Sequence, residues 1–484
     1  MKIKIGIATP FIMMGILCTP LLLNCIWALP ASDDFSNYSK CLLFGGSVLK
    51  YIPYCVYENY VNWQGTYLGA ALASVPIFFC FGIVFLRVAY LISVLLFIFS
   101  IVDLLYRILV LFLGGVGHTR NGRYIVLGIV SFFALLYIFN GQLDELFYWW
   151  TAVAVYTIPL TFAVFSVSML FRFYYKKKHV ELFFSVLFAL MGAGGALDIS
   201  VLLCLMLIGG ALLIYLSKKE YFASIIVIAS SILGTIINVC APGNFVRHGN
   251  YANGYDLIEC LKYTVSDVSI ELYAGMVCGL IPLLIVSVIT LTIKYMCNTY
   301  SQDISFKQVC FATVYCLFAI YFVNFPVYLG YHRSYLNARS YFVERVTIGL
   351  FLVVLCIVWG VWMSRFSRRI LKLSMIILFY VFCWSSIFFV QTTNEYEPIR
   401  MMVSILNGTT PRVSKRELDI LEAIEHYTER EVYLSYTVPV DEWTGIKTIG
   451  LTDDVTNWVN VSVSYIYNKD CVSVKYCDEN NIED

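Results

Sequence analysis

Long runs of apolar residues, separated by short polar stretches, make up most of this 484-residue sequence. A run of about 20 apolar residues is long enough to cross the hydrocarbon core of a bilayer as a helix. A helix also satisfies its own backbone polar groups, which lipid cannot do. The pattern therefore predicts an all-α, polytopic membrane bundle. About eleven transmembrane helices are predicted, at residues 5–28, 88–113, 124–139, 151–172, 180–196, 199–216, 221–240, 272–296, 309–329, 343–363 and 371–390.

Basic residues cluster in alternate loops of this pattern. Cytoplasmic loops carry the excess of Lys and Arg, so these clusters indicate a cytoplasmic N-terminus. The clusters are Lys2/Lys4, Arg120/Arg123, Lys176 to Lys178, Lys218/Lys219 and Arg365/Arg368/Arg369/Lys372. The outer face then receives the tail after residue 390 and five loops, at residues 29–65, 140–150, 192–198, 241–271 and 330–342.

One further apolar stretch, residues 66–86, conflicts with this orientation. If it crossed the membrane, every later segment would be inverted and the basic clusters would lie outside. We therefore predict that it is an interfacial or re-entrant segment packed against the bundle. A hairpin of two short spans over residues 88–116 is the alternative.

The tail, residues 391–484, differs sharply in composition from the transmembrane domain at residues 1–390. Leu418, Leu421, Ile424 and Tyr427 recur at helical spacing and predict an amphipathic helix. The runs "EVYLSYTV" and "VNVSVSYIY" alternate as β-strands do. The tail is therefore predicted to form a small α+β extracytoplasmic domain.

Composition agrees with a membrane protein. Hydrophobic residues make up 60% of the chain and charged residues 13%, whereas soluble domains contain about 25% charged residues. The net charge of +1 and the lack of a basic arm give no reason to expect a nucleic-acid partner. Most of the 16 Cys lie in apolar runs without zinc-site spacing, and only Cys471 and Cys477 are candidates for a disulfide.

The predicted outer loops hold the polar residues that are candidates for function. Arg binds phosphate oxygens in a bidentate manner, aromatic rings and carboxylates suit a sugar, and a carboxylate can act as a general base. Loop 29–65 is an external acidic loop, in which Asp33 or Asp34 is the candidate base. The other acid of the pair would position the base or a divalent cation, Mg²⁺ or Mn²⁺. The candidate substrate-binding residues are Trp63, Glu145, Trp149, Tyr156, Asp198, Asn244, Arg247, Arg333 and Arg339.

Each of these residues also has a purely structural interpretation. Asp33, Asp34 and Asp198 have side chains that favour helix N-termini. Asn244 lies in a Pro-Gly-Asn stretch that forms turns by itself. Arg333 and Arg339 suit nonspecific contact with lipid headgroups, and Trp149 suits an interfacial aromatic belt.

A first helix followed by "SDDF" on the outer face resembles the GT-C superfamily of polytopic glycosyltransferases. The chain is also similar to an uncharacterised bacterial membrane-protein family near that superfamily. The similarity comprises "DDF", W-x-G at Trp63 to Gly65, and P-G-N-x-x-R from Pro242 to Arg247. It also includes an acidic-aromatic loop from Glu145 to Pro159, a Gly-rich turn ending at Asp198, and "DDVTNWVN" with "SYIY" near the C-terminus. Two positions depart from the family pattern: Thr66 replaces an Arg, and Asp198 often is Glu.

The resemblance implies a transferase that takes a sugar from a polyprenyl-phosphate-linked donor. Its acceptor would be a cell-surface glycan or lipid at the outer face of a bacterial inner (plasma) membrane. Expected partners are thus membrane lipid, the lipid-linked donor and the glycan acceptor. A transporter or flippase of lipid-linked glycans is one alternative, which predicts ionisable groups deep in the membrane. A non-catalytic partner in polysaccharide assembly is the other.

Overall fold

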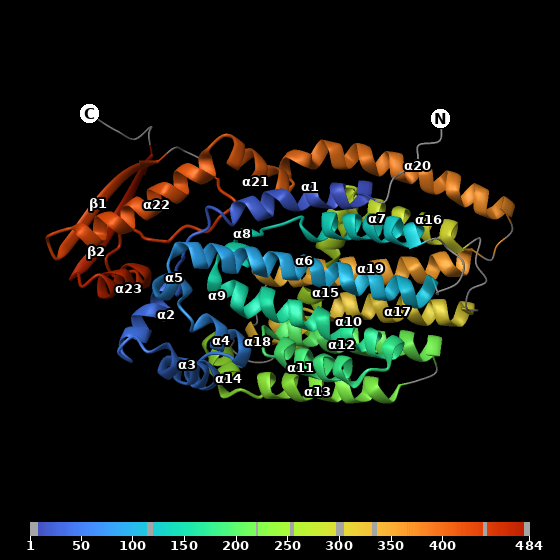
Figure 1. Cartoon of the computed structure of the whole chain (residues 1–484), viewed down its shortest axis with the longest axis horizontal. Helices are drawn as coiled ribbons and strands as arrows, with labels where there is room; N and C mark the ends of the chain where they lie inside the picture. Colours follow the sequence, from blue (N-terminus) through green and yellow to red (C-terminus); the bar gives the residue numbers. More distant parts are fainter. Residues whose placement is uncertain are drawn as a thin grey trace.

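A computed structural model describes residues 8–113, 120–218, 221–251, 256–296, 304–331, 336–364, 366, 368–438 and 443–478. The described chain is mostly helical and ends in a small pair of strands, as the sequence predicted in outline. Figure 1 shows the long helices side by side, with β1 and β2 at one end of the molecule.

The first half of the chain contains helices of very unequal length. They are α1 (Ala8–Asn24), α2 (Asp33–Leu42), α3 (Val48–Asn62), α4 (Tyr67–Ala73), α5 (Ile77–Phe81), α6 (Ile83–Leu113), α7 (Arg120–Ile138), α8 (Asp144–Tyr148), α9 (Trp150–Ala152), a π-helical turn (Val153–Thr157), α10 (Ile158–Lys176), α11 (His179–Ala193), α12 (Leu197–Lys218) and α13 (Phe222–Val239).

The second half continues the bundle and then forms the tail. Its elements are α14 (Pro242–Tyr251), α15 (Leu257–Val277), α16 (Leu280–Met296), α17 (Phe306–Phe322), α18 (Phe325–Tyr331), α19 (Ala338–Met363), α20 (Arg368–Thr392), a 3₁₀ turn (Thr393–Glu395), α21 (Glu397–Leu406), α22 (Thr409–His426), β1 (Glu431–Val438), α23 (Trp458–Ile466) and β2 (Cys471–Asp478).

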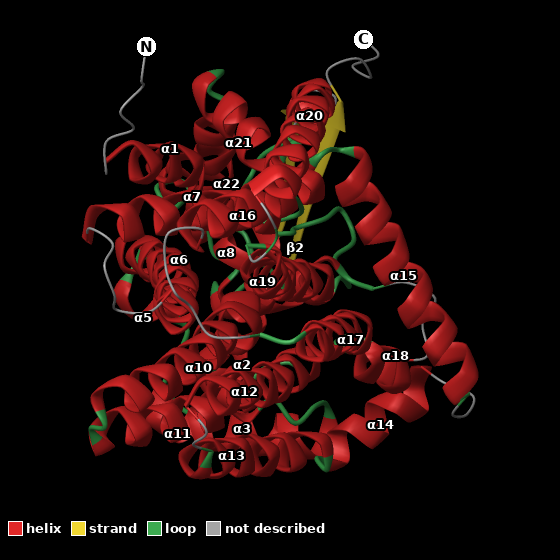
Figure 2. Ribbon diagram, turned by 90° about the vertical axis from the view of Figure 1, so that its right-hand side faces the viewer, coloured by secondary structure: helices red, strands yellow, loops and turns green. Residues whose placement is uncertain are grey.

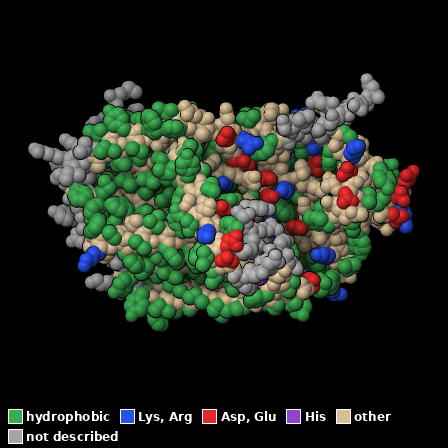
Figure 3. All heavy atoms as spheres, turned by 180° about the vertical axis from the view of Figure 1, so that it is seen from behind, with side chains coloured by type: hydrophobic (Ala, Val, Ile, Leu, Met, Phe, Trp, Pro, Cys, Tyr) green, Lys and Arg blue, Asp and Glu red, His purple; other side chains and the backbone are tan. Residues whose placement is uncertain are grey.

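Seven helices in the described part of the chain are long and apolar enough to cross a membrane, and α15 with α16 could supply an eighth. Four shorter apolar helical segments remain, of which α1, α7 and α11 match predicted spans. On the face drawn in Figure 3, hydrophobic side chains cover most of the half away from the tail, and charged side chains gather toward the tail. The prediction of a mostly helical bundle with several membrane-length apolar helices is therefore confirmed, whereas about eleven crossings stay a prediction.

The apolar stretch at 66–86 is broken rather than continuous. It forms two short helices, α4 and α5, and Gly82 separates them from α6 with a φ of +86° that favours glycine. The alternative hairpin over 88–116 is wrong, because α6 is one helix of 31 residues with no internal Gly or Pro.

Two predicted outer loops are mainly helical, which corrects the sequence analysis. Loop 29–65 contains α2 and α3, and loop 241–271 contains α14 and most of α15. The predicted helix 272–296 is instead divided, since α15 and α16 meet at an angle of 74°. The break falls at Gly279, whose φ is +80° and where a Cβ would lie 2.3 Å from the backbone oxygen of Ser385.

The tail places two parallel strands, β1 and β2, side by side. The amphipathic helix is confirmed as α22 and "EVYLSYTV" as β1, but "VNVSVSYIY" is not a strand. It forms α23, because Asn457 accepts a hydrogen bond from the backbone N–H of Val459 at the helix start, and Val459 and Val463 are buried one turn apart. Cys471 and Cys477 stand at opposite ends of β2, about 20 Å apart at 3.3 Å per residue, so they do not pair.

The tail and the bundle share their hydrophobic cores. Met401 and Ile446 belong to the main core of the bundle. In return, Phe35 from α2 is fully buried in the core of the tail, among residues such as Ile420 and Val472. The predicted boundary at residue 390 therefore marks a change of composition and not a structural separation.

Candidate functional site

Asp33 and Asp34 begin α2 on the same end of the molecule as the tail. Asp34 is buried and accepts hydrogen bonds from Ala31 N (2.9 Å), Thr151 Oγ1 (3.1 Å) and Thr151 N (3.3 Å). Burial raises the pKa of Asp34 to about 7, although these hydrogen bonds lower it. Because both of its oxygens are occupied, Asp34 connects α2 to α9 and is a poor candidate for contact with a substrate.

Asp33 has a different environment. It is half-buried, and within the part of the chain that the structure describes no group donates a hydrogen bond to its carboxylate. Burial raises the pKa of Asp33, while the positive charges of Arg339 and Lys40 act in the opposite direction. Of the two acids, Asp33 has the carboxylate that can receive a proton from a ligand.

A cluster of charged and aromatic side chains lies close to Asp33, whose carboxyl group is influenced by the positive charge of Arg339 in this cluster. Glu145 in α8 contacts Arg339 of α19 (Oε2 to Nε, 3.5 Å) and Lys447 of the tail (Oε1 to Nζ, 2.9 Å). The ring of Trp149 lies near both cations, with Arg339 Cζ 4.9 Å and Lys447 Nζ 5.6 Å from its centre. We call these four residues the rim cluster. Trp149 is buried between two cations, so it is not part of a lipid-facing belt.

A small polar cavity of about 50 Å³ lies next to the rim cluster. Its lining includes Tyr156, Asp198 and Arg247. The Arg339 side chain connects it to the rim cluster, because the guanidinium is also 5.6 Å from the Tyr156 ring centre. The cavity holds a few water molecules or one small polar group, since a single water needs about 10–15 Å³.

Three oxygen atoms at this cavity have no hydrogen-bond partner among the residues that the structure describes. They belong to Thr66 (Oγ1), Asp198 (Oδ2) and Asn238 (Oδ1), and all three residues are buried. The amide of Asn238 is oriented by its NH₂ group, which donates to the carbonyls of Ala193 (2.9 Å) and Gly195 (2.7 Å). Buried polar atoms are normally paired, so these oxygens indicate a place where water or a ligand binds.

The W-x-G and P-G-N-x-x-R motifs form one interlocked unit. The Arg247 guanidinium lies 4.3 Å from the Trp63 ring centre and donates a hydrogen bond to Gln64 Oε1. Asn244 accepts from Gly65 N (3.3 Å) and donates to the Asn238 carbonyl (2.6 Å). Asn244 therefore links the two motifs, at the start of a helix and not in the turn that the Pro-Gly-Asn stretch predicted, and both Asn244 and Arg247 line the cavity.

The predicted site residues thus fall into a connected set with two exceptions. Asp33, Glu145, Trp149 and Arg339 lie at the rim cluster, and Tyr156, Asp198 and Arg247 at the cavity, with Trp63 behind Arg247. Asn244 lines the cavity and also links the two motifs, whereas Asp34 is structural. Arg333 lies outside the described residues.

Lys447 is the member of the rim cluster that sequence reasoning missed. It lies in "WTGIKTIG", a tail segment about 300 residues from Glu145 in sequence. Its only signal is a single Lys in an otherwise apolar segment. Sequence reasoning also missed Asn324, in the turn between α17 and α18, and Glu344, which precedes Arg345 in α19.

A divalent cation does not fit the two adjacent acids. Both oxygens of Asp34 already accept hydrogen bonds from Ala31 and Thr151, so an ion bound by both acids would compete with these contacts. No group of three His, Cys, Asp or Glu side chains suited to a metal occurs among the described residues. No family model, curated protein or solved structure matches the chain.

Proposed function

We propose that the protein is an integral membrane glycosyltransferase that takes a sugar from a polyprenyl-phosphate-linked donor. The acceptor is a cell-surface glycan or lipid at the outer face of the membrane. The observation that supports the proposal is the position of Asp33, with a carboxylate that accepts no hydrogen bond, beside the rim cluster of two cations and a Trp ring.

In this proposal Asp33 acts as general base. It takes the proton from the acceptor hydroxyl as that oxygen forms a bond with the anomeric carbon of the donor sugar. The bond from that carbon to the phosphate oxygen breaks, and the polyprenyl phosphate leaves with the electron pair. Arg339, Lys447 and Arg247 stabilise the negative charge of the leaving phosphate. Burial raises the pKa of Asp33, which makes its carboxylate a stronger base.

The proposed location is the bacterial inner (plasma) membrane, with the N-terminus in the cytoplasm and the tail outside. About eleven crossings require α1, α7 and α11 to cross beside the longer helices. In support, α6, α10, α12 and α19 all end at the end of the bundle away from β1 and β2 (Figure 1). The loops at those ends carry the basic clusters that favour the cytoplasm.

The two acids provide the test of this proposal. Purified protein in proteoliposomes is incubated with a panel of polyprenyl-phosphate-linked hexoses and a membrane-glycan extract, and sugar transfer is measured. Asp33→Asn should lower the transfer rate at least about 100-fold, the scale of general-base catalysis. Asp34→Asn should retain most of the wild-type transfer rate per amount of folded protein. The matched control is Asp419→Asn, on the exposed face of α22. Full transfer by Asp33→Asn would overturn the proposal.

A second candidate, a transporter or flippase of lipid-linked glycans, is favoured by one specific observation. Glu271 and Glu344 lie buried, and Arg345 half-buried, within candidate membrane-spanning helices, where ionisable groups are often part of a transport pathway. Movement of a labelled lipid-linked sugar across the bilayer, with no glycosidic bond formed, would support this candidate. Bond formation that depends on Asp33 would support the transferase.

A further inference from the structure

A cluster of buried acidic side chains lies between α15 and α19, away from Asp33 and the rim cluster. The inward-facing side of α15 is formed by Cys260, Thr264, Asp267, Val268, Glu271 and Gly275. Most of the large hydrophobic residues of α15, such as Ile270 and Tyr273, are exposed instead. Figure 2 shows α15 along one edge of the molecule. Polar contacts therefore contribute to its attachment, beside apolar contacts such as those of Cys260 with Tyr328 and of Val268 with the main core.

Two of the acids in this cluster have strong partners. Arg345 of α19 donates to both oxygens of Glu271, from Nε (2.8 Å) and Nη2 (3.2 Å). Gly141 leaves room for that guanidinium, because a Cβ at this position would lie 1.5 Å from Arg345 Nη1. Asp267 accepts hydrogen bonds from the phenol groups of Tyr328 and Tyr341.

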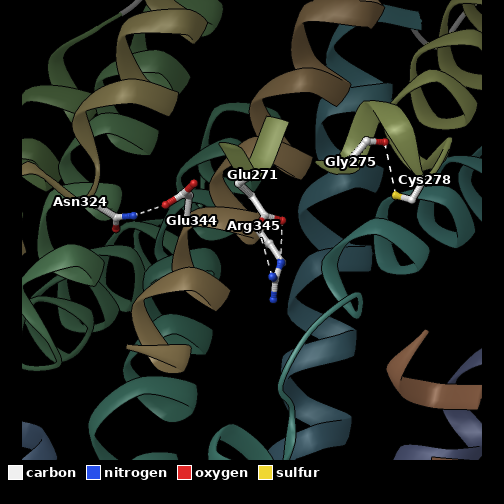
Figure 4. A network of polar contacts seen from close by, with 6 residues as sticks. All are labelled: Glu271, Gly275, Cys278, Asn324, Glu344 and Arg345. Atoms are coloured by element: carbon white, nitrogen blue, oxygen red, sulfur yellow. Dashed lines mark hydrogen bonds and ion pairs between the residues drawn. The ribbon is translucent and has the colours of Figure 1, made fainter. Parts of the chain in front are cut away.

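The third acid, Glu344, has no cationic partner in the described part of the chain. It is fully buried, and only one of its oxygens, Oε2, accepts a hydrogen bond, from Asn324. Its other oxygen, Oε1, has no partner. Figure 4 shows Glu344 between Asn324 and the Glu271–Arg345 pair.

The charges around Glu344 determine whether its carboxyl group is ionised or protonated. The groups that face it are the acids Glu271 and Asp267 of α15, Arg345 of α19, the Asn324 amide, and the phenol groups of Tyr137 (α7), Tyr328 (α18) and Tyr341 (α19). Three carboxyl groups thus share one guanidinium, and Arg345 is already paired with Glu271. An ionised Glu344 would be a buried charge without a counter-ion, beside two other negative charges, which is a costly arrangement.

The same place holds two further groups that indicate a missing partner. The Asn324 side-chain oxygen and the Tyr137 hydroxyl are fully buried and make no hydrogen bond with any described residue. A carboxylic acid can donate as well as accept, so a proton on Glu344 supplies a donor to a neighbourhood that contains unpaired oxygen acceptors.

We propose that Glu344 is a proton-binding site of the transmembrane domain, and that its proton keeps α15 attached to α19. With the proton bound, Arg345 has one acidic partner and pairs with Glu271. Without it, Glu344 competes with Glu271 for the same guanidinium, and the contact that holds the inward side of α15 weakens. The ligand of this site is a single exchangeable proton, and the site is independent of the proposed sugar transfer.

Infrared difference spectroscopy on the full chain in lipid nanodiscs tests the bound proton. The wild-type protein at pH 7.5 should show a carboxylic-acid C=O band that is absent from Glu344→Gln. The matched control is Glu181→Gln, since Glu181 is also buried but has one Arg partner of its own, Arg172 at 3.4 Å. Its spectrum should retain the band. Identical carboxylic-acid bands in the wild type and Glu344→Gln would overturn the proposal.

Hydrogen exchange of the α15 amides tests the second half of the proposal and does not depend on the folding of a variant. After correction for the intrinsic pH dependence of exchange, α15 of the wild type should exchange at least about tenfold faster at pH 9.5 than at pH 7, a change of about 1.4 kcal/mol in opening free energy. Amides of α10 should show no such change. In Glu344→Gln the corrected rates of α15 should be the same at both pH values. An equal response of α15 and α10 in the wild type would refute the role of the proton in holding α15.

Discussion

Three consecutive residues, Asp33, Asp34 and Phe35, have three different roles because each is turned about 100° from the one before it along α2. Phe35 packs in the core of the tail, and Asp34 accepts hydrogen bonds from the backbone N–H and the hydroxyl of Thr151. The carboxylate of Asp33 accepts no hydrogen bond from the described residues and can bind a ligand. The two buried neighbours therefore fix the position of the one acid that is available to a ligand.

At the residue scale, the first prediction concerns the pH dependence of stability. Burial raises the pKa of Asp34 from 3.8 to about 7, so the folded state holds a proton that the unfolded state releases between about pH 4 and pH 7. Stability is therefore lost as pH rises through this range, by roughly 4 kcal/mol at most. Asp34→Asn should remove this contribution, and denaturant unfolding at pH 5 and pH 8 measures it.

The variant has an expected cost as well. The Asn side chain has one acceptor oxygen where Asp has two, so Asp34→Asn loses one hydrogen bond. The variant should therefore be about 1 kcal/mol less stable than the wild type at pH 5. At pH 8 the difference should vanish or reverse. Parallel changes with pH in the two proteins would contradict the prediction.

Chemistry alone was enough to find most of the candidate residues, since acids, arginines and aromatic residues in membrane-rim loops are costly unless they have a role. It could not decide between Asp33 and Asp34, because that choice depends on how α2 is rotated against α9. It also could not find Lys447, whose position depends on the folding of a tail that is distant in sequence.

At the scale of elements, the interlocked motifs show why two glycines stand where they do. Gly243, at the second position of α14, approaches the backbone of α3 so closely that a Cβ would lie 2.5 Å from Trp63 N. At Gly65 a Cβ would lie 1.9 Å from the Asn238 carbonyl oxygen. The glycines thus allow the close contact that brings Arg247 onto the Trp63 ring.

A matched pair of substitutions in α14 tests this contact. Gly243→Ala should destabilise the protein by about 1–3 kcal/mol, because the added methyl overpacks a backbone contact. Gly249→Ala is the control, since nothing lies within 4 Å of a Cβ there and Ala favours a helix by up to about 1 kcal/mol. Thermal unfolding of both variants in the same detergent gives the comparison. Equal midpoints would show that the α3–α14 contact is loose.

Prediction from the sequence was more accurate for the positions of the long helices than for their bends or for the structure of the short segments. Apolar periodicity identifies a long helix, but "VNVSVSYIY" fits a strand by alternation and a helix by its buried Val459 and Val463. The Asn457 cap decides in favour of the helix. The broken helix at Gly279 depends on contact with α20, which sequence pattern does not contain.

At the scale of the whole molecule, the tail is a structural part of the bundle. The segment that carries Lys447 is fixed at both ends: Gly445 accepts a hydrogen bond from Asn24 Nδ2 (3.2 Å), and Ile449 accepts one from Ser32 N (2.9 Å). Between them, Ile446 is buried in the main core. The rim cluster therefore exists only while this segment remains inserted.

A charge placed in this segment should release it. Ile446→Asp should cost at least about 3 kcal/mol, because it buries an unpaired carboxylate. Val461→Asp is the control, since Val461 in α23 is 52% exposed. Limited proteolysis should cut the tail of Ile446→Asp much faster than that of the control and of the wild type. Similar cleavage of all three proteins would mean that the segment is not anchored by its core contacts.

The burial of Phe35 in the core of the tail has a consequence for biosynthesis. A ribosome makes Asp33 and Phe35 within the first forty residues of this sequence, but Val472, which packs in the same core, follows more than four hundred residues later. While the intervening helices enter the membrane, the nascent chain has no pocket to receive the Phe35 ring. Asp33, two residues before Phe35, can therefore reach its position beside the rim cluster only near the end of translation, and a prematurely terminated chain would carry Asp33 without the Lys447 of that cluster.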